Sequence, residues 1–346
     1  MNILVVRFRQ MGDAILATAL LNTLHHNFPE ARIDFVLNES IAPLFSGHPS
    51  IDRILTFSDD ERHRPLVYLK KVWSIVRHTR YDVIIDMRST VNTMLFALLS
   101  PRTPYRIGVK KGYTALAFNH PVGHCGNSRS MVDYDTQFAQ PLSKLRPIQP
   151  IRRFTLPITE EEKATFGTYL QGQGIDLQKP VMLVNVTAKL AAKVWRQDRM
   201  VWVLRQFLQS FPHYQLIFNY APGQEEADAR QIYHELGSPA QVFIDVQARS
   251  SRQLAAMGHF MTLFFGNEGG ARHIMHAMGC PTLAICAPGN SKTVWIPQDD
   301  VPAQGISPDD FATGEQLAQM SPEQQYDLIT KEEVWRRLRD FTLQIT

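Results

Sequence analysis

The sequence predicts an α/β protein with two doubly wound parallel sheets, one in each half of the chain. Three observations support this prediction. Short apolar runs alternate with stretches of helical periodicity, which is typical of parallel sheets covered by helices on both faces. The alternation stops at a segment rich in Pro and basic residues near residue 150 and then starts again. A length of 346 residues also exceeds one ordinary domain of roughly 100–200 residues.

The first half begins with an apolar, β-rich run at Asn2–Val6. Leu, Ile and Ala then recur at helical spacing over residues 14–24, and Pro29 ends this predicted helix. The same reasoning predicts strands at 33–37, 54–57, 83–86 and 106–108 and a helix at 66–78. Together these elements form one Rossmann-like half.

The second half repeats this organisation, with strands predicted at 181–186, 215–219, 242–244, 261–266 and 282–286. The boundary is placed near residue 157, because a helix opening with the capping pattern of Thr159 and Glu162 follows the Pro-rich linker. The chain therefore divides into domains 1–157 and 158–346. A closing helix at 331–341 is expected to pack along a domain face.

Composition and charge exclude several classes of protein. With 44% hydrophobic and 20% charged residues, the chain has a globular composition, which excludes a disordered or collagen-like protein. The 36 Lys and Arg against 33 Asp and Glu leave a net charge of +3, too weak to indicate a nucleic-acid partner. No apolar run approaches the roughly 18 residues of a bilayer span, so membrane contact is expected only at the periphery.

The three cysteines, Cys125, Cys280 and Cys286, form no CxxC pair and no zinc-like group with histidine. Neither a disulfide framework nor a metal site is therefore expected. The N-terminus shows no basic leader before its first strand, so it does not read as a secretory signal. A reducing, cytoplasmic location fits these features best.

Ligands of doubly wound sheets bind beyond the carboxyl ends of the strands, so binding and catalytic residues are expected in the loops there. The first such loop, RFRQMGDA, holds only Gly12. The GxGxxG spacing of a dinucleotide site is thus absent, and a nicotinamide enzyme is not expected. Asp13 stands at the start of a helix, where the helix dipole stabilises a carboxylate. From the residues alone, this capping role is the favoured interpretation of Asp13.

Two loops of the second half carry charged groups beyond a strand. Lys189 and Lys193 follow the strand at 181–186, where two ammonium groups can hold a diphosphate or simply lie in solvent. Glu225 and Glu226 lie at the start of a later helix. A carboxylate there can accept hydrogen bonds from ribose hydroxyls or cap the helix, and the two interpretations are equally supported.

A glycine pair marks the third loop of interest, in the segment FFGNEGGARHIMHAMG. Gly269 and Gly270 open a helix, whose N–H groups are then available to a phosphate. No Gly-Lys-Ser/Thr follows, so this is not a Walker motif. His273 in the same helix can donate to a phosphate or to a nearby carbonyl, and the residue alone favours the second role.

Three segments in order resemble glycosyltransferase family 9, the heptosyltransferases of bacterial lipopolysaccharide core assembly. They are MGDAILATALL, KVW at 193–195 and GNEGGARHIMHAMGCPTLAICAP, and the resemblance extends over nearly the whole chain. It implies a GT-B fold, in which two Rossmann-like domains face each other across a cleft. The first domain would bind mainly the acceptor and the second the nucleotide sugar.

The resemblance implies roles for individual residues. Asp13 matches the family's catalytic carboxylate, which would act as a general base. Lys193 matches the lysine that contacts the donor phosphates, and Glu225 matches the glutamate that holds the ribose. Glu268, Gly269, Gly270 and His273 align with an NDSGPMH-like segment that binds the donor, and Lys189 is added to this group by its position in the lysine loop.

The sequence departs from the family pattern at several of these positions. Glu268 replaces the usual Asp, Ala271 and Arg272 replace Pro-Met, and Ala287 stands where Gly is typical. The longer Glu268 side chain bears on the contact with the sugar. Such changes bear on which nucleotide sugar the protein uses as donor.

The resemblance also implies a phosphorylated, acidic lipid-sugar as acceptor, and hence a basic surface on the first domain. The candidate residues are Arg7, Arg9, Arg88, Arg106 and Arg129. Peripheral contact with the inner membrane, from the cytoplasmic face, would bring the enzyme to this acceptor. The DxD sequence Asp133-Tyr134-Asp135 lies in a predicted helix, where positions two apart point away from each other, so it is not interpreted as a metal site.

The predicted activity is metal-independent, inverting transfer of a heptose from ADP-heptose to a hydroxyl of the lipopolysaccharide inner core, on a lipid A-Kdo or heptosyl acceptor. No cofactor is expected. Two alternatives stay open, namely transfer of another sugar from another nucleotide, and a non-catalytic protein that binds a nucleotide sugar. A protein that only binds has no need of a base, which argues for catalysis.

Overall fold

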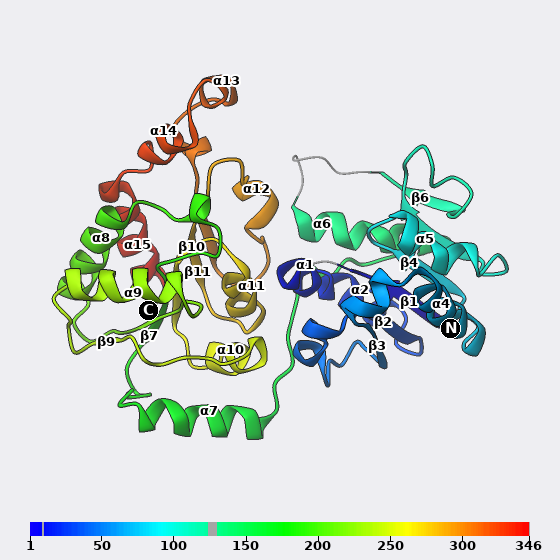
Figure 1. Ribbon diagram of the computed structural model, residues 1–346, viewed down its shortest axis with the longest axis horizontal. Coiled ribbons are helices and arrows are strands. Elements are labelled where there is room, and N and C mark those ends of the chain that lie inside the picture. Colours follow the sequence, from blue (N-terminus) through cyan, green and yellow to red (C-terminus); the bar gives the residue numbers. More distant parts are fainter. Residues whose placement is uncertain (9, 124–129, 346) are drawn as a thin grey trace. The chain divides into compact units, whose positions relative to one another are not determined.

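The computed structural model describes residues 1–8, 10–123 and 130–345. The chain divides into two compact units, Met1–Pro157 and Ile158–Thr346. Each unit contains one six-stranded parallel sheet with helices around it, as Figure 1 shows. The predicted α/β architecture with two parallel sheets is confirmed. Within the described ranges, no helix is both long and apolar enough to cross a membrane.

The sheet of the first unit has the strand order β3-β2-β1-β4-β5-β6, and all neighbouring strands are parallel. The two central strands, β1 and β4, consist of buried residues apart from Asn2 at the start of β1. The winding reverses between them, so their carboxyl ends form the switch point at which such sheets bind ligands. The strands are β1 Asn2–Val6, β2 Arg32–Asn38, β3 Arg53–Phe57, β4 Val83–Asp86, β5 Tyr105–Val109 and β6 His120–Val122.

The helices of the first unit lie around this sheet. The helix predicted at 14–24 is instead two consecutive helices that meet at Ala17. The hydroxyl of Thr18 donates to the Ile15 carbonyl at 2.7 Å, which satisfies that carbonyl where the helical hydrogen-bond pattern is interrupted. The helices are α1 Met11–Leu16, α2 Thr18–Asn27, α3 Asp59–His63, α4 Pro65–His78, α5 Val91–Leu98 and α6 Met131–Thr136, with 3₁₀ segments η1 Glu39–Phe45 and η3 Gln137–Lys144.

The sheet of the second unit has the order β12-β11-β10-β7-β8-β9. When the strands of each unit are numbered from one, both sheets have the order 3-2-1-4-5-6. The strands β6 and β12 were not predicted, because short edge strands with few apolar residues give only a weak periodic signal. The strands are β7 Val181–Asn185, β8 Gln215–Phe218, β9 Val242–Phe243, β10 Leu263–Asn267, β11 Thr282–Ile285 and β12 Ala303–Ile306.

Helices also surround the second sheet. The predicted capping box at the start of α7 is present, since Thr159 and Glu162 bond each other's backbone N–H groups. The helices are α7 Glu160–Gly172, α8 Gln197–Ser210, α9 Gln224–Glu235, α10 Ser251–Gly258, α11 Gly270–Ala277, α12 Lys292–Trp295, α13 Gly314–Ala318, α14 Pro322–Asp327 and α15 Lys331–Ile345, with 3₁₀ segments η4 Ala191–Lys193 and η5 Pro308–Asp310.

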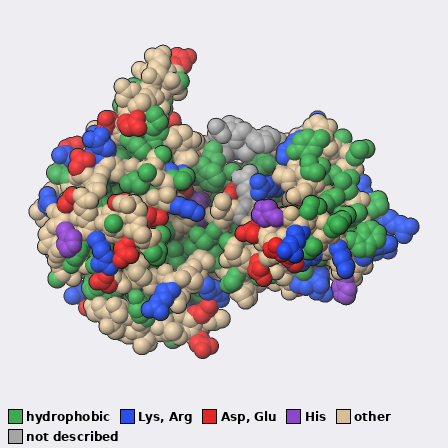
Figure 2. All heavy atoms as spheres, viewed as in Figure 1, with side chains coloured by type: hydrophobic (Ala, Val, Ile, Leu, Met, Phe, Trp, Pro, Cys, Tyr) green, Lys and Arg blue, Asp and Glu red, His purple; other side chains and the backbone are tan. Residues whose placement is uncertain are grey.

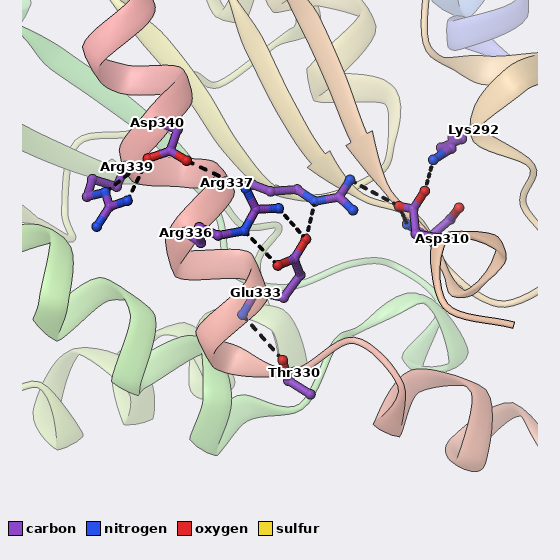
Figure 3. Close-up of polar contacts among 9 residues, drawn as sticks. Lys292, Asp310, Thr330, Glu333, Arg336, Arg337, Arg339 and Asp340 are labelled. Atoms are coloured by element: carbon purple, nitrogen blue, oxygen red, sulfur yellow. Dashed lines mark hydrogen bonds and ion pairs between the residues drawn. The ribbon is translucent and has the colours of Figure 1, made fainter.

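The C-terminal helix α15 closes the second unit by packing on α8, as predicted for residues 331–341. Its polar side carries an ion-pair network, drawn in Figure 3. Arg337 lies 2.8 Å from Glu333 and 3.1 Å from Asp310, and Asp310 also pairs with Lys292 of α12. The network thereby connects the closing helix to the segment that follows β11.

Candidate active site

The predicted residues gather at the switch point of each sheet. In the first unit, Asp13 follows β1 and Arg88 follows β4. In the second unit, Lys193 follows β7 and Glu268 follows β10. Each pair of loops leaves the carboxyl ends of two adjacent central strands, which is where ligands of doubly wound sheets bind. The structure therefore gives two half-sites, one in each unit.

Asp13 is a buried carboxylate in the first turn of α1. Its Oδ1 lies 3.5 Å from Nη2 of Arg7, the residue that directly follows β1. A first-turn position alone would leave the side chain to interact only with the helix N-terminus. The buried Arg7 gives Asp13 a specific charged partner in addition, which fixes the position of its carboxylate.

Arg7 was predicted to lie on a basic surface that binds the acceptor, and in the structure it is buried. Its side chain is only 1% exposed, and its guanidinium lies between two carboxylates, with Nη2 3.3 Å from Oδ1 of Asp135. Nη1 donates to the Met87 carbonyl at 3.3 Å. Burial makes removal of a charge partner costly, so Arg7 holds Asp13 and Asp135 in place rather than meeting a ligand from solvent.

The two aspartates of the DxD sequence have different partners. Asp135 faces Arg7 in the interior, whereas Asp133 lies 2.8 Å from Arg152 at the surface. Helix positions two apart point in different directions, as expected. Asp135 was missed as a site residue, because nothing in the sequence shows that α6 packs beside the loop after β1.

The loop after β4 is held by the buried carboxylate of Asp86. Its Oδ1 accepts from the backbone N–H groups of Arg88 at 3.0 Å and Ser89 at 2.8 Å. Burial raises the pKa of Asp86 to about 6, although these hydrogen bonds oppose the shift. Ser89 has φ +52°, a strained conformation for a residue with a Cβ, and its hydroxyl accepts from the N–H of Val109 at 2.7 Å. The position of Arg88 is thus fixed by its neighbours.

A cavity of about 370 Å³ opens beside Arg88 at the start of α5. Arg62 and Arg88 line it together with the N-terminus of α5, a combination that suits an anion. Arg62 also pairs with Asp59 at 3.4 Å, and Arg88 donates to the Phe8 carbonyl. The sequence analysis found Arg88 but not Arg62, which no motif marks. The lining residues are Phe8, Arg62, Tyr68, Arg88, Thr90, Val91, Asn92 and Thr93.

The other arginines proposed for the acceptor do not join this cavity in the described part of the chain. Arg106 donates to the carbonyls of Ala117 and Pro101, so it holds the neighbouring loop together. Arg9 and Arg129 lie outside the residues that the structure describes.

Asparagine side chains fix the loops of the second half-site. Asn267, at the end of β10, accepts from the N–H of Trp195 at 2.9 Å and donates to the Val186 carbonyl at 2.9 Å. Asn185, at the end of β7, donates to the Asn267 carbonyl at 2.9 Å. These bonds hold the lysine loop beside the glycine loop. The sequence analysis did not single out either asparagine.

Gly266 is the glycine that this arrangement requires. Its φ is +126°, and a Cβ at this position would lie 2.4 Å from the carbonyl oxygen of Asn185 on the neighbouring strand. A side chain is therefore excluded both by the backbone conformation and by space. Gly269 differs, because its φ of 178° is extended and the nearest atom to a Cβ there is 3.9 Å away.

We expect Gly266→Ala to lower the free energy of unfolding by at least about 2 kcal/mol, since the new Cβ meets backbone atoms that cannot rotate away. Gly269→Ala is the matched control and should cost less than about 1 kcal/mol. Thermal unfolding of the two variants checks this. Equal melting temperatures would show that β7 and β10 can separate enough to admit a side chain.

Glu268 lies buried among three cationic or basic groups. Its carboxylate oxygens are 3.5 Å from Nε2 of His273, 3.8 Å from Nη2 of Arg272 and 3.8 Å from Nζ of Lys193. Burial alone raises the pKa of Glu268, but the His273 hydrogen bond and the charges of Arg272 and Lys193 outweigh it and lower the pKa to about 2. Glu268 is therefore ionised and can orient Lys193.

Arg272 is fully buried in the first turn of α11. Nη2 donates to the Trp295 carbonyl at 2.8 Å, while Nε and Nη1 have no hydrogen-bond partner among the described residues. Burial lowers its pKa, and the charge of Glu268 opposes that shift. This cation adds positive potential at the helix start, where the first N–H groups also lack intrahelical partners.

Glu225 and its neighbour Glu226 have different partners in the structure. Its Oε2 accepts from the hydroxyl of Thr187, just after β7, at 3.0 Å. Glu226 instead pairs with Arg230 on the same helix at 3.0 Å. Glu225 is therefore held at the loop that follows β7, whereas Gly269, Gly270 and His273 lie at the start of α11 and Lys189 is an exposed side chain of the lysine loop.

Comparison with known proteins shows the family to which the chain belongs. A family model described as glycosyltransferase family 9 (heptosyltransferase) matches residues 69–300. The chain belongs to glycosyltransferase family 9. It is 18% identical over 291 residues to lipopolysaccharide heptosyltransferase 1 of Campylobacter coli, covering 82% of this chain and 83% of that relative.

Solved structures of this family share the fold. The family 9 glycosyltransferase of Veillonella parvula superposes with a TM-score of 0.83 at 17% identity, over 99% of this chain and 97% of the other. The E. coli ADP-heptose LPS heptosyltransferase II superposes with a TM-score of 0.72 at 19% identity, over 99% of both chains. The protein is thus a family 9 glycosyltransferase with a GT-B fold, and both predictions are confirmed.

Two departures from the family 9 pattern lie beside each other in this glycosyltransferase. The resemblance implies Asp at position 268 and Met at position 272, and in the structure the Glu268 and Arg272 side chains that stand there lie 3.8 Å apart, one helical turn from each other. A buried arginine needs a carboxylate nearby, and the longer Glu268 side chain reaches toward it. The two replacements therefore form one local unit.

Proposed function

We propose that the protein transfers a heptose from ADP-heptose to a hydroxyl of a lipopolysaccharide inner-core sugar and inverts the anomeric centre. The observation that carries the proposal is the second half-site, where Lys193 and the N-terminus of α11 converge at the switch point. Such a site suits the diphosphate of a nucleotide sugar. The E. coli structural relative, described as an ADP-heptose LPS enzyme, supports the choice of donor.

In this proposal Asp13 is the general base. The acceptor oxygen attacks the anomeric carbon while Asp13 takes its proton, the bond to the diphosphate oxygen breaks, and ADP leaves with the electron pair. Arg7 lies 3.5 Å from the Asp13 carboxylate and 3.3 Å from that of Asp135, so the buried guanidinium would hold the base in position. General-base catalysis of this kind is worth about 10²–10⁴-fold.

Lys193 and the N–H groups at Gly269 and Gly270 would stabilise the charge that grows on the leaving diphosphate. Preorganised groups of this kind act without reorganisation during the reaction. Glu225, held by Thr187, would accept hydrogen bonds from the ribose hydroxyls. These residues supply the positive charge that the leaving group requires, so the proposed reaction uses no metal ion.

The acceptor would bind in the first unit through anionic groups. The cavity between Arg62 and Arg88 has the charge to hold a phosphate of a lipid A-Kdo or heptosyl acceptor. Such an acceptor is anchored in the inner membrane, and the enzyme would meet it at the cytoplasmic face. Incubation with ADP-heptose and a set of truncated core acceptors, with products identified by mass, tests this proposal directly.

ADP is expected to raise the melting temperature more than UDP or NAD at equal concentration. A ligand that binds only the folded state stabilises it by about 2.7 kcal/mol at a hundred times its Kd. Thermal unfolding with each nucleotide measures the difference. Equal shifts for the three nucleotides would remove adenine recognition from the proposal.

A second candidate is a family 9 transferase with a different nucleotide sugar. The observation that favours it is the Glu268–Arg272 unit, which changes the charge and shape beside the donor. Turnover assays with other nucleotide sugars distinguish the two candidates. Stabilisation by ADP with no transfer to any acceptor would instead indicate a protein that binds nucleotide sugars without catalysis.

A further inference from the structure

Helix α4 exposes an apolar stripe beside the face that it buries. Tyr68, Val72 and Val76 pack into the core of the first unit. Leu66 is 82% exposed, Leu69 39% and Trp73 45%. The exposed residues are spaced by three and four positions, so they form one stripe along the helix. Single exposed apolar residues are common on proteins, but a stripe of large ones is not.

Cations are interleaved with this apolar stripe. Lys70 and Arg77 lie on the same face, and the Arg77 guanidinium is 4.5 Å from the centre of the Trp73 ring. Neither cation forms an ion pair with any acidic residue in the described part of the chain. Residues 62–81 contain no Asp or Glu, and Lys71, on another side of the helix, pairs with Glu61 at 2.6 Å, so the positive charge of the exposed stripe comes from Lys70 and Arg77.

The apolar face continues onto the neighbouring helix α5. Trp73 and the 43% exposed Leu98 line one groove of about 590 Å³, together with Arg77, Arg80 and Arg102. In Figure 2, green and blue side chains gather where Figure 1 places α4 and α5. We define the α4–α5 surface as Leu66, Leu69, Lys70, Trp73, Arg77 and Leu98.

We propose that the α4–α5 surface binds an anionic lipid bilayer, with its apolar side chains among the headgroups and its cations at the lipid phosphates. An amphipathic helix with Trp and Leu between basic residues has the composition of an interfacial helix. Unneutralised cations match the negative surface of such a membrane. Binding to an apolar protein partner would not explain why residues 62–81 contain no Asp or Glu.

This inference rests on the proposed function, since that function requires a lipid-linked acceptor. The same two helices line the cavity with Arg62 and Arg88, to which Tyr68 of α4 and Thr93 of α5 contribute. A bilayer bound at the α4–α5 surface would approach the predicted acceptor cavity at the Leu66 end of that surface, because Leu66 and Tyr68 both lie in the first turn of α4. The surface and the cavity share no residue.

Vesicle co-sedimentation of the full chain, without donor or acceptor, tests the proposal. We expect binding to vesicles of phosphatidylcholine with 30% phosphatidylglycerol, and at least tenfold weaker binding to pure phosphatidylcholine. Leu66→Glu should weaken binding to the anionic vesicles about tenfold or more, and Lys70→Gln about fivefold. Leu343→Glu is the matched control, because Leu343 is 62% exposed on α15 of the other unit, and it should bind like the wild type.

Unchanged binding by Leu66→Glu and Lys70→Gln would overturn the proposal, as would binding without dependence on lipid charge. A dimer in light scattering that Leu66→Glu dissociates would assign the surface to a second copy of the chain. Heptose transfer to a water-soluble, deacylated acceptor separates this inference from the proposed function. Transfer without vesicle binding removes only the membrane surface, whereas vesicle binding without transfer removes only the proposed reaction.

Discussion

Replacing Asp13 by Asn is expected to lower kcat by about 10²-fold or more, while folding and ADP affinity are retained. The amide is nearly isosteric with the carboxylate but cannot take the proton of the acceptor hydroxyl. Asn also keeps an oxygen that can accept from Arg7, so the guanidinium is not left without a partner. The measurements are melting temperature, ADP affinity and the rate of sugar transfer on one variant.

A purely structural Asp13 predicts a different result. Loss of a first-turn charge costs about 0.3–1 kcal/mol of stability and leaves turnover almost unchanged. Asp133→Asn is a suitable control, because Asp133 pairs with Arg152 at the surface of the same unit. Near-wild-type transfer by the Asp13 variant would exclude it as the base, and Glu268 would become the carboxylate to examine.

Replacing Lys193 by Ala is expected to lower kcat/KM by about 10²–10³-fold, through both a higher donor KM and a lower kcat. Lys193 acts on charge that is present in the bound donor and increases on the leaving group. Its removal leaves Glu268 with Arg272 and His273 as partners, so that no buried charge is orphaned. The fold should therefore be intact, as thermal unfolding would verify.

The control for Lys193→Ala is Lys179→Ala, since Lys179 is an exposed lysine of the same unit, paired with Asp176 at 3.7 Å. Its kinetics should match those of the wild type. If Lys193→Ala also retained wild-type kinetics, the diphosphate would have to be held by Lys189 or by the helix N-terminus alone.

Much of the fold follows from local sequence patterns. The strand at Val83–Asp86 was predicted with its observed bounds, because a buried parallel strand is a continuous apolar run between polar segments. The start of α7 was predicted from its capping box, which is a contact between neighbours in sequence. Such features need no knowledge of tertiary packing.

The parts of the site that were missed depend on packing between distant segments. Arg7 reads as a surface charge after a strand, and only the tertiary fold brings Asp135, 128 residues later, against it. Arg62 joins Arg88 for the same reason. Two signals were present but not used, namely the i,i+4 spacing of Glu268 and Arg272 and the isolated glycine, Gly266, inside an apolar strand.

The two sheets have the same strand order and form separate units, which affects how substitutions can accumulate in this protein during evolution. Each unit has its own hydrophobic core, and the residues assigned to acceptor and donor lie on different units. A substitution that alters one half-site, such as the Glu268–Arg272 replacement, is absorbed by the packing of its own unit. In the proposed assignment of acceptor to one unit and donor to the other, a substitution can therefore change the preference for one substrate without changing the preference for the other.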